Sequence, residues 1–423
     1  MKYCILFLAL LTCSIAHGQG IGKRVLFLGN SYTGVNNLPQ MLANVASSTG
    51  DTLLFDSNTP GGYTLQGHSG NAISLAKITQ GNWDFVVLQE QSQLPSFPIS
   101  QVQADVFPYA QLLDSIINAQ NPCAETVFYM TWGRKNGDAS NCASWPPVCT
   151  YAGMDSLLNL RYRMMANDNN AIVSPVAVVW RYIIQNYPLL DLYQADQSHP
   201  SVAGTYAAAC SFYTVLFRKD PTAITFNSSL SATDAANIRT ATKFMVYDSL
   251  MKWHVGAYDP SANFSYTVSN GNQVTFTNNS LNADHFSWNF GDGASASDNN
   301  PSHTYLTAGT YTIKLMASKC GLSDSSFQTI NISAPFSVNE TNESSELSMY
   351  PNPVTNILHV KYTFSNKITY KIVNIKGQEI QSGIITNSEK QIHVSSLSEG
   401  IYFLKLYDNH KLLGQHKFVK LAK

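Results

Sequence analysis

Short apolar runs alternate with segments of helical periodicity over the first half of the chain, from about residue 21 to about residue 258. The apolar runs predict strands at residues 24–28, 84–88, 126–131 and 171–175. The helical pattern covers residues 40–46, 72–78, 102–119, 154–167, 178–186 and 201–217. This alternation predicts a parallel sheet with helices on both faces, which is a three-layer α/β sandwich.

The pattern changes near residue 260, where the helical period ends and strands separated by frequent turns begin. These strands are predicted at residues 264–268, 273–278, 285–290, 309–317 and 326–332. Residues 334–346 are rich in Ser, Asn, Glu and Thr, which is typical of a linker. A second set of strands is predicted at residues 357–362, 368–374, 391–394 and 401–407. We therefore expect two all-β sandwich domains after the α/β domain.

The first eighteen residues have the pattern of an export signal. Met1-Lys2 supplies a basic start, residues 5–11 form a short apolar centre, and Ala16-His17-Gly18 has the small residues of a cleavage site. The apolar centre is too short to span a bilayer, and no later run approaches that length. We therefore expect a signal peptide over residues 1–18 and a soluble mature protein.

Length and charge narrow the possible architectures and partners. A chain of 423 residues, 44% of them hydrophobic, is too long for one core, so it should form two or more domains. The formal net charge is −1, which gives no basic footprint for nucleic acid. We expect no nucleic-acid partner.

The cysteines that follow the signal predict one disulfide. Cys142 and Cys149 bracket a short Pro-rich loop, and an exported protein meets an oxidising environment. Cys210 lies in an apolar helical stretch and is interpreted as a buried hydrophobe. The odd number of cysteines leaves the pairing of Cys123, Cys210 and Cys320 open. The sequence has no Cys-x-x-Cys pair and no cluster of metal ligands, so we expect neither a metal nor a cofactor.

A serine follows the first predicted strand, at the edge where sheets of this class bind ligands. Residues 25–28 run into Gly29, which permits a sharp turn, and Ser31 comes two positions later. Asp196 and His199 stand three residues apart, just before the helical pattern of residues 201–217. Serine needs an imidazole to take its proton, and the imidazole needs a carboxylate to fix its tautomer. These three residues therefore suit a catalytic triad.

Gly29-Asn30-Ser31 and Asp196-x-x-His199-Pro200 together resemble the SGNH, or GDSL-like, hydrolase family. The resemblance implies a flavodoxin-like fold and cleavage of esters through a Ser-Asp-His triad. Residues 61–65, Gly-Gly-Tyr-Thr-Leu, match the second sequence block of that family. The match implies that the backbone N–H groups of Ser31 and Gly62 form an oxyanion hole.

The third block departs from the usual pattern of the family, which is Gly-x-Asn-Asp after a strand. Here the chain has Gln89-Glu90-Gln91-Ser92. Gln91 falls where the family has asparagine and is the expected third oxyanion donor, with Gln89 as the alternative. Asn30 also stands where aspartate is more common. The chain therefore looks most like a less-studied SGNH branch.

Three further residues are candidates for contact with substrate. His68 follows the oxyanion glycine closely, and Trp132 and Arg134 come at the end of a strand that should point toward the cleft. A histidine in the position of His68 can instead cap a helix or face water, and Trp132 can instead pack in the core.

The two β-rich regions also resemble known families. Residues 288–293, Trp-Asn-Phe-Gly-Asp-Gly, with residues 301–305 and 309–313, resemble the polycystic-kidney-disease (PKD) repeat, an immunoglobulin-like module. Tyr-Pro-Asn-Pro at residues 350–353, with residues 397–402, resembles the C-terminal sorting domain of the type IX secretion system. The second resemblance implies that this machinery carries the protein across the outer membrane.

These observations predict the domain organisation and the function together. The domains expected are a signal peptide over residues 1–18, an SGNH-like hydrolase over 21–258, a PKD-like sandwich over 259–333, a linker over 334–346 and a sorting domain over 347–423. We expect a secreted or surface-located serine esterase that cleaves O-acetyl or other short-acyl esters of carbohydrates, with lipid esters as the second choice of substrate. The PKD-like domain would contact a glycan or a protein. The alternative is a hydrolase-fold protein without activity that binds glycans or cell-surface partners.

Overall fold

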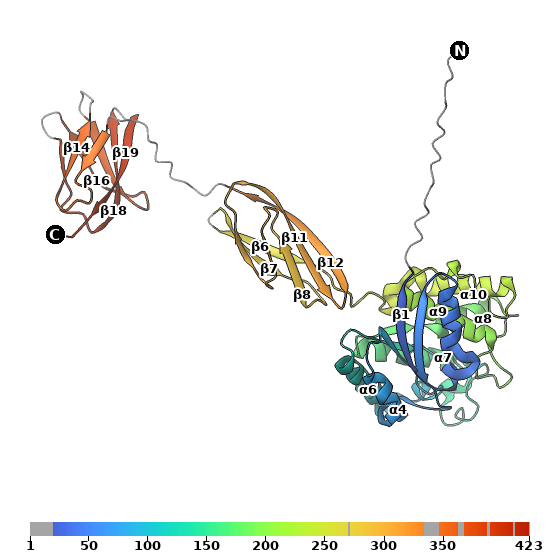
Figure 1. Cartoon of the computed structure of the whole chain (residues 1–423). Coiled ribbons are helices and arrows are strands. Elements are labelled where there is room, and N and C mark those ends of the chain that lie inside the picture. Colours follow the sequence, from blue (N-terminus) through green and yellow to red (C-terminus); the bar gives the residue numbers. More distant parts are fainter. Residues whose placement is uncertain are drawn as a thin grey trace, which may run out of the picture. The chain divides into compact units, whose positions relative to one another are not determined.

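The computed structural model describes residues 20–269, 271–333, 347–362, 368–386, 390–408 and 411–422. The predicted signal peptide and the predicted linker lie outside the described residues. The chain divides into two compact units, Met1–Ser333 and Ala334–Lys423. The first unit contains an α/β domain and a β-sandwich, and the second contains a further β-sandwich (Figure 1).

The α/β domain is built on a five-stranded sheet in which every neighbouring pair is parallel. Its strands are β1 (Gly22–Leu28), β2 (Thr52–Asn58), β3 (Phe85–Leu88), β4 (Glu125–Tyr129) and β5 (Ile172–Ser174). The spatial order β2-β1-β3-β4-β5 is that of a flavodoxin-like fold, which confirms the predicted fold class. Strands β1 and β3 lie at the centre and are apolar on both faces, as expected when helices cover both sides.

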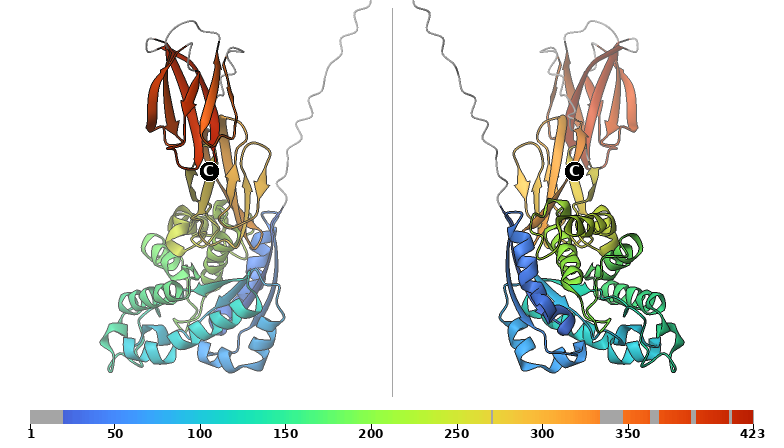
Figure 2. Two further views of the ribbon diagram at one scale, coloured as in Figure 1. Left: turned by 90° about the vertical axis from the view of Figure 1, so that its left-hand side faces the viewer. Right: turned by 90° about the vertical axis from the view of Figure 1, so that its right-hand side faces the viewer.

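Helices cover both faces of this sheet (Figure 2). Helices α2, α9 and α10 pack together on one face, and α3, α4, α6 and α7 pack on the other. Helix α9 is buried on nearly every side, as its continuous apolar sequence predicts. The helices are α1 (Ser31–Gly34), α2 (Leu38–Ser47), α3 (Leu65–Gly70), α4 (Ala72–Thr79), α5 (Ile99–Asp105), α6 (Phe107–Gln120), α7 (Tyr151–Asp168), α8 (Val176–Asn186), α9 (Val202–Phe217) and α10 (Ala232–Met245). Short 3₁₀ turns are η1 (Val35–Asn37), η2 (Leu94–Ser96), η3 (Pro146–Cys149), η4 (Pro221–Ala223) and η5 (Tyr247–Trp253).

Three elements of the α/β domain differ from the sequence-based prediction. Strand β2 was not predicted, because it is an edge strand whose polar residues hide the apolar pattern. The helix predicted over residues 102–119 is two helices, α5 and α6, since Pro108 in the first turn of α6 has no N–H to continue the earlier helix. Helix α10 was also missed, because it buries only a narrow stripe of small and apolar residues.

The second domain is a sandwich of two antiparallel sheets, with strand orders β10-β7-β6 and β12-β11-β8-β9. An aromatic core between the sheets includes Phe276, Trp288 and Tyr305. Gly291 turns the chain after β8 at φ +84°, and a Cβ there would meet the backbone of Thr312 at 2.7 Å. The strands are β6 (Phe264–Ser269), β7 (Gln273–Asn278), β8 (His285–Asn289), β9 (Ser295–Ala296), β10 (Ser302–Thr304), β11 (Gly309–Lys319) and β12 (Leu322–Ile332).

The second unit is also an antiparallel sandwich, with strand orders β13-β14-β17 and β16-β15-β18-β19. Alternate residues of its central strands, such as Ile372, Leu404 and Leu406, form its core. Three of its strands, β13, β16 and β19, were not predicted. The strands are β13 (Leu347–Tyr350), β14 (Ile357–Tyr362), β15 (Ile368–Asn374), β16 (Glu379–Ile385), β17 (Gln391–His393), β18 (Gly400–Asp408) and β19 (Lys411–Lys420).

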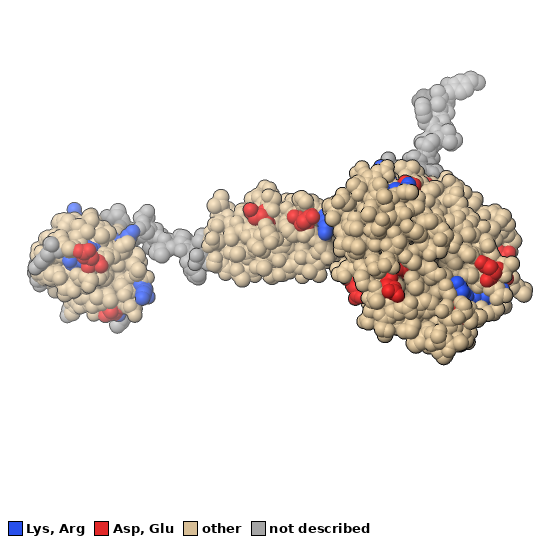
Figure 3. All heavy atoms as spheres, turned by 90° about the horizontal axis from the view of Figure 1, so that it is seen from below, with Lys and Arg blue, Asp and Glu red and all other residues tan. Residues whose placement is uncertain are grey.

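On the face drawn in Figure 3, Lys and Arg are interspersed with Asp and Glu, and neither sign gathers into a large patch. Within the described residues, no helix has both the length and the apolar character that crossing a membrane requires.

Two disulfides are present in the first unit. Cys142 and Cys149 are bonded, as the sequence predicted, and the buried Cys210 is free. Cys123, just before β4, is bonded to Cys320 in the turn between β11 and β12, which links the α/β domain covalently to the second domain. Arg218 of the α/β domain also pairs with Asp259 at the start of the second.

Replacing both Cys123 and Cys320 by serine is expected to lower the free energy of unfolding by about 5 kcal/mol, because a long cross-link restricts the unfolded chain strongly. The two cysteines are 197 residues apart. The matched double variant at Cys142 and Cys149 opens a link over only 7 residues. It should lose only about 2 kcal/mol. Urea unfolding without reductant measures both losses, and equal losses would contradict the loop-length argument.

Candidate active site

The candidate nucleophile, Ser31, stands at the carboxyl end of the central strand β1. Gly29 follows the strand, and a Cβ at this position would meet the Thr33 and Gln89 side chains at 2.6 and 2.7 Å. Asn30 is the N-cap of the short helix α1, and its side-chain oxygen accepts the N–H of Tyr32 at 3.1 Å. The tight turn and the cap fix Ser31 as the first residue of α1, with its side chain only partly buried.

Beneath this turn lies a buried pair of carboxamides, Asn30 and Gln89. Gln89 donates to the side-chain oxygen of Asn30 at 2.9 Å, and its own oxygen accepts the backbone N–H of Asn30 at 2.9 Å. Asn30 also donates to the backbone carbonyls of Tyr63 and Glu90. An aspartate at position 30 could not donate to these carbonyls. The pairing therefore explains two departures from the usual family pattern, at positions 30 and 89, by one structural cause.

His68 supports the turn from below and does not face the substrate side, so its predicted contact with substrate is wrong. Its side chain is fully buried. Nε2 lies 2.9 Å from the Gly29 carbonyl and must donate to it, so Nδ1 accepts from the Ser74 hydroxyl at 2.7 Å. Burial lowers the pKa of His68, and this effect is larger than the opposing effect of the hydrogen bond to Gly29. The lowered pKa favours the neutral imidazole.

The loop before α9 brings Asp196 and His199 to Ser31. His199 Nε2 lies 2.8 Å from Ser31 Oγ, and its Nδ1 is hydrogen-bonded to Asp196 Oδ2. The second carboxylate oxygen accepts the backbone N–H groups of Ser198 and His199, each at 3.0 Å. Burial alone would raise the pKa of Asp196, but these hydrogen bonds outweigh it and the net shift is downward. Asp196 is thus held as an anion next to the ring.

Side chains from the nucleophile region hold this loop in place. Asn36 donates to the Pro200 carbonyl at 3.0 Å and to the Thr205 hydroxyl at 2.9 Å. The hydroxyl of Tyr32 is hydrogen-bonded to Ser198 Oγ at 2.6 Å. Sequence reasoning did not identify Asn36, since nothing in its local sequence indicates a partner far along the chain.

Trp132 supports the same loop from the core and has no exposed surface, which favours the alternative of core packing over contact with substrate. Its ring is stacked between Trp180 and Tyr32, with centroid distances of 3.6 and 4.9 Å. Its indole N–H donates to the Ser198 carbonyl at 3.1 Å. Trp132 therefore connects the apolar core to the loop that carries His199.

The candidate oxyanion donors differ in their availability. In the part of the chain that the structure describes, the backbone N–H groups of Ser31 and Gly62 have no acceptor. Gly62 is exposed and has φ +72°. Both amide hydrogens of Gln89 are used, by Asn30 and by the Glu90 carbonyl, so the alternative donor is excluded. Gln91 uses one amide hydrogen on Gln93, which leaves one free.

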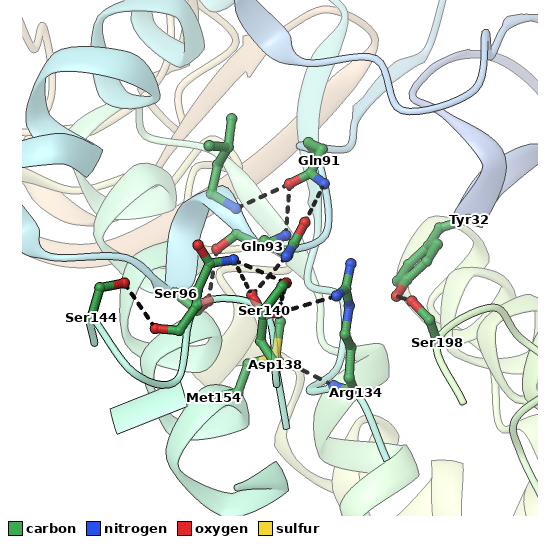
Figure 4. Close-up of polar contacts among 12 residues, drawn as sticks. Tyr32, Gln91, Gln93, Ser96, Arg134, Asp138, Ser140, Ser144, Met154 and Ser198 are labelled. Carbon is green, nitrogen blue, oxygen red and sulfur yellow. Dashed lines mark hydrogen bonds and ion pairs between the residues drawn. The ribbon is translucent and has the colours of Figure 1, made fainter. Parts of the chain in front are cut away.

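Arg134 follows β4, on the segment before α7 that also contains the Cys142–Cys149 disulfide. Figure 4 shows its side chain beside Asp138. Its Nη1 lies 3.3 Å from Asp138, whose carboxylate is completely buried. Asp138 also accepts hydrogen bonds from Gln93, Ser140 and Asn141. Of the three candidates for contact with substrate, Arg134 alone keeps an exposed part, 27% of its side chain.

Glu90 is a buried carboxyl that sequence reasoning did not single out. Its side chain accepts the N–H of Leu65, the first residue of α3, and the N–H of Gln91. Burial raises the pKa of Glu90 to about 8, against the opposing effect of these two hydrogen bonds. Glu90 thus ties the segment after Gly62 to the third block.

No group of three or more metal-ligating side chains occurs among the described residues.

Comparisons with known proteins bear on all three domains. A family model described as PKD domain matches residues 259–334, and one described as secretion system C-terminal sorting domain matches residues 348–420. Both resemblances drawn from the sequence are confirmed. The sorting domain indicates export by the type IX system to the cell surface or the medium. Among curated proteins, none matches the chain.

Solved structures similar to the α/β region include several hydrolases. A DUF4886 family protein from Bacteroides uniformis is 15% identical, with 54% of this chain and 95% of that chain covered and a TM-score of 0.47. A protein from Slackia heliotrinireducens, described as a candidate SGNH hydrolase, is 28% identical, with coverages of 46% and 99% and a TM-score of 0.39. The esterase EstA from Pseudoalteromonas is 15% identical, with coverages of 46% and 97% and a TM-score of 0.33.

Replacing Glu90 by glutamine is expected to remove a pH dependence of stability. The carboxyl has an ordinary pKa of 4.5 and a folded-state pKa of about 8, so the folded protein holds the proton that the unfolded chain releases between these values. Wild-type stability should therefore fall across this window, relative to Glu90→Gln, by about 2 kcal/mol or more. Urea unfolding at pH 5 and pH 8 measures the difference, and parallel pH profiles for the two proteins would show the argument to be wrong.

Proposed function

We propose that this chain is a secreted serine esterase that hydrolyses short-acyl esters of carbohydrates through Ser31, His199 and Asp196. The observation that carries the proposal is the hydrogen-bonded series from Asp196 through the His199 ring to Ser31 Oγ, at 2.8 Å for the last step. A serine, an imidazole and an anionic carboxylate in this order form the arrangement that activates a hydroxyl for attack on a carbonyl.

In the proposed mechanism, Ser31 Oγ forms a bond to the ester carbonyl carbon while its proton moves to His199 Nε2. Asp196 holds Nδ1–H and stabilises the imidazolium. When the C–O bond to the leaving alcohol breaks, His199 gives its proton to that oxygen. Water then repeats the two proton transfers, which releases the acid and restores Ser31.

The negative oxygen that forms during attack would be bound by the free N–H groups of Ser31 and Gly62. Gln91 is proposed as the third donor through its remaining amide hydrogen. Loss of one such donor typically costs about 3 kcal/mol of transition-state stabilisation. The segment from Gly62 to Leu65 is tied to the third block through Glu90, which supports a fixed position for these donors.

The openness of the site favours a bulky, hydrated substrate. The Asp196 and His199 side chains are 47% and 31% exposed, and Gly61 and Gly62 are both exposed. Such a site admits a glycan chain, whereas a long acyl chain is bound best in an enclosed apolar pocket. Export through the sorting domain places the protein where glycans are met, and we propose a glycan or a protein as the partner of the PKD domain.

The second candidate function, glycan binding without catalysis, draws its support from the unusual third block. The buried pairing of Asn30 with Gln89 gives that departure a structural role that leaves Ser31 and His199 intact. The unusual sequence of the third block is therefore weaker support for a protein without activity.

Hydrolysis of p-nitrophenyl acetate, butyrate and octanoate by the mature protein tests the proposal. We expect the acetate to be the best substrate. Ser31→Ala and His199→Ala should each lower kcat by about 10⁴-fold or more, because the triad acts as a unit. A fluorophosphonate should label the wild type and not Ser31→Ala.

Matched controls are Ser144→Ala and His285→Ala, which remove exposed side chains outside the candidate site and should leave turnover unchanged. A preference for octanoate would redirect the proposal to lipid esters. A folded protein with neither turnover nor labelling would favour the glycan-binding alternative.

A further inference from the structure

The Arg134–Asp138 pair lies near Tyr32 and Ser198 and has no part in the proposed chemistry. Figure 4 shows the Arg134 guanidinium between Asp138 on one side and Tyr32 with Ser198 on the other. Burial raises the pKa of the Tyr32 phenol, and the charge of Arg134 opposes this shift, which indicates that the guanidinium is within electrostatic reach of that ring. Tyr32 and Ser198 are the chain neighbours of Ser31 and His199, so Arg134 lies near the two segments that carry these residues.

Asp138 does not depend on Arg134 for its hydrogen bonds. Its two oxygens accept from Ser140, Gln93 and Asn141 at 2.5, 2.6 and 2.7 Å, whereas Arg134 Nη1 is 3.3 Å away. A charge-assisted hydrogen bond to a guanidinium is usually about 2.7–2.9 Å long. The three uncharged donors therefore supply the short hydrogen bonds of Asp138. The charge of Arg134 adds to them in lowering the pKa of Asp138, and the longer contact orients the arginine.

Much of the guanidinium has no partner within the protein. Arg134 Nε is buried and unpaired, and among the described residues Nη2 also has no acceptor. Nε has almost no accessible surface, so the edge that a ligand could reach is formed by Nη2 and the second hydrogen of Nη1. In Figure 4 the outer nitrogen points away from Asp138, toward the space between Gln91 and Tyr32.

We propose that Arg134 is a specificity-determining residue that binds a carboxylate on the substrate, close to the scissile ester. The planar fork of a guanidinium matches the two oxygens of a carboxylate, which a neutral sugar does not offer. The substrate class is then a uronic acid, or a glycan that contains one, in which a sugar hydroxyl carries the acyl group and the carboxylate is free. This inference rests on the proposed esterase function and names its substrate class.

The loop that carries Arg134 is built to hold one orientation. The backbone N–H of Arg134 donates to Met154 Sδ at 3.4 Å. The backbone N–H of Asp138 donates to the carbonyl of Val148, next to the disulfide-bonded Cys149. A rigid arginine loses little conformational freedom on binding, which increases the affinity that each hydrogen bond contributes.

The test compares acetylated glucuronate with acetylated glucose as substrates of the full mature chain. We expect wild type to prefer the glucuronate ester. Arg134→Gln should lower kcat/KM for that ester by about 10- to 100-fold, the range expected for a lost hydrogen bond to a charged group, mainly through KM. Hydrolysis of the glucose ester should change less than about threefold, since its only loss is of uncharged contacts. Arg134→Lys keeps the charge without the fork and should fall between the two.

The matched control is Lys135→Gln, which removes a neighbouring positive charge that is paired with Asp191 at 2.8 Å. It should keep the wild-type preference. Fluorophosphonate labelling of Ser31 in each variant shows that the site is folded and active. In addition, free glucuronate should inhibit hydrolysis of p-nitrophenyl acetate by wild type and not by Arg134→Gln, while glucose inhibits neither.

Two results would overturn the inference, and they differ from each other. In the first, both wild type and Arg134→Gln are labelled and turn over substrate, with the same ratio of kcat/KM for the glucuronate ester to kcat/KM for the glucose ester. This result would contradict the carboxylate site and leave the esterase proposal standing. Absence of both labelling and turnover in wild type would remove the two proposals together.

Discussion

The buried pairing of Asn30 with Gln89 is the interaction on which the candidate site depends. Asn30 follows β1 and Gln89 follows β3, so the pair joins the carboxyl ends of two neighbouring strands of the sheet. Every donor and acceptor of the two carboxamides is engaged, so a change in either leaves a buried polar group without a partner. From this pair, Asn30 caps the helix that begins at Ser31, and Gln89 fixes the start of the third block. The position of the nucleophile is therefore determined by hydrogen bonds in the core.

The remaining contacts connect this part of the site to the loop that carries His199. Trp132 is packed in the aromatic core and donates a hydrogen bond to the Ser198 carbonyl, next to His199. Asn36, in the segment after Ser31, donates to the Pro200 carbonyl. Ser31 and His199, 168 residues apart, thus meet through several independent supports. None of these supports touches the reacting atoms, which leaves the face of the triad free.

Sequence reasoning reached the fold, and it singled out Ser31, Asp196 and His199, which the structure brings together, because both leave local signatures. Buried parallel strands give continuous apolar runs, and Asp196 and His199 lie close together on one loop. The roles of His68 and Trp132 were not predictable in this way, because whether a side chain is buried depends on elements far away in the sequence. The bond between Cys123 and Cys320 has no local signature either, since 197 residues separate its ends. The polar edge strand β2 was missed for the related reason that solvent on one side weakens its apolar pattern.

The exposure of the triad has a consequence for the fate of an acyl group attached to Ser31. Enzymes that pass such a group to a second alcohol must keep water away from it, and they do so by closing the site. Here nearly half of the Asp196 side chain and a third of the His199 side chain face solvent. In the proposed reaction, water would approach an acyl group on Ser31 from this open side, and a sugar hydroxyl would have to compete with it. The exposure of Asp196 and His199 therefore favours hydrolysis over transfer of the group to a second sugar, within that proposal.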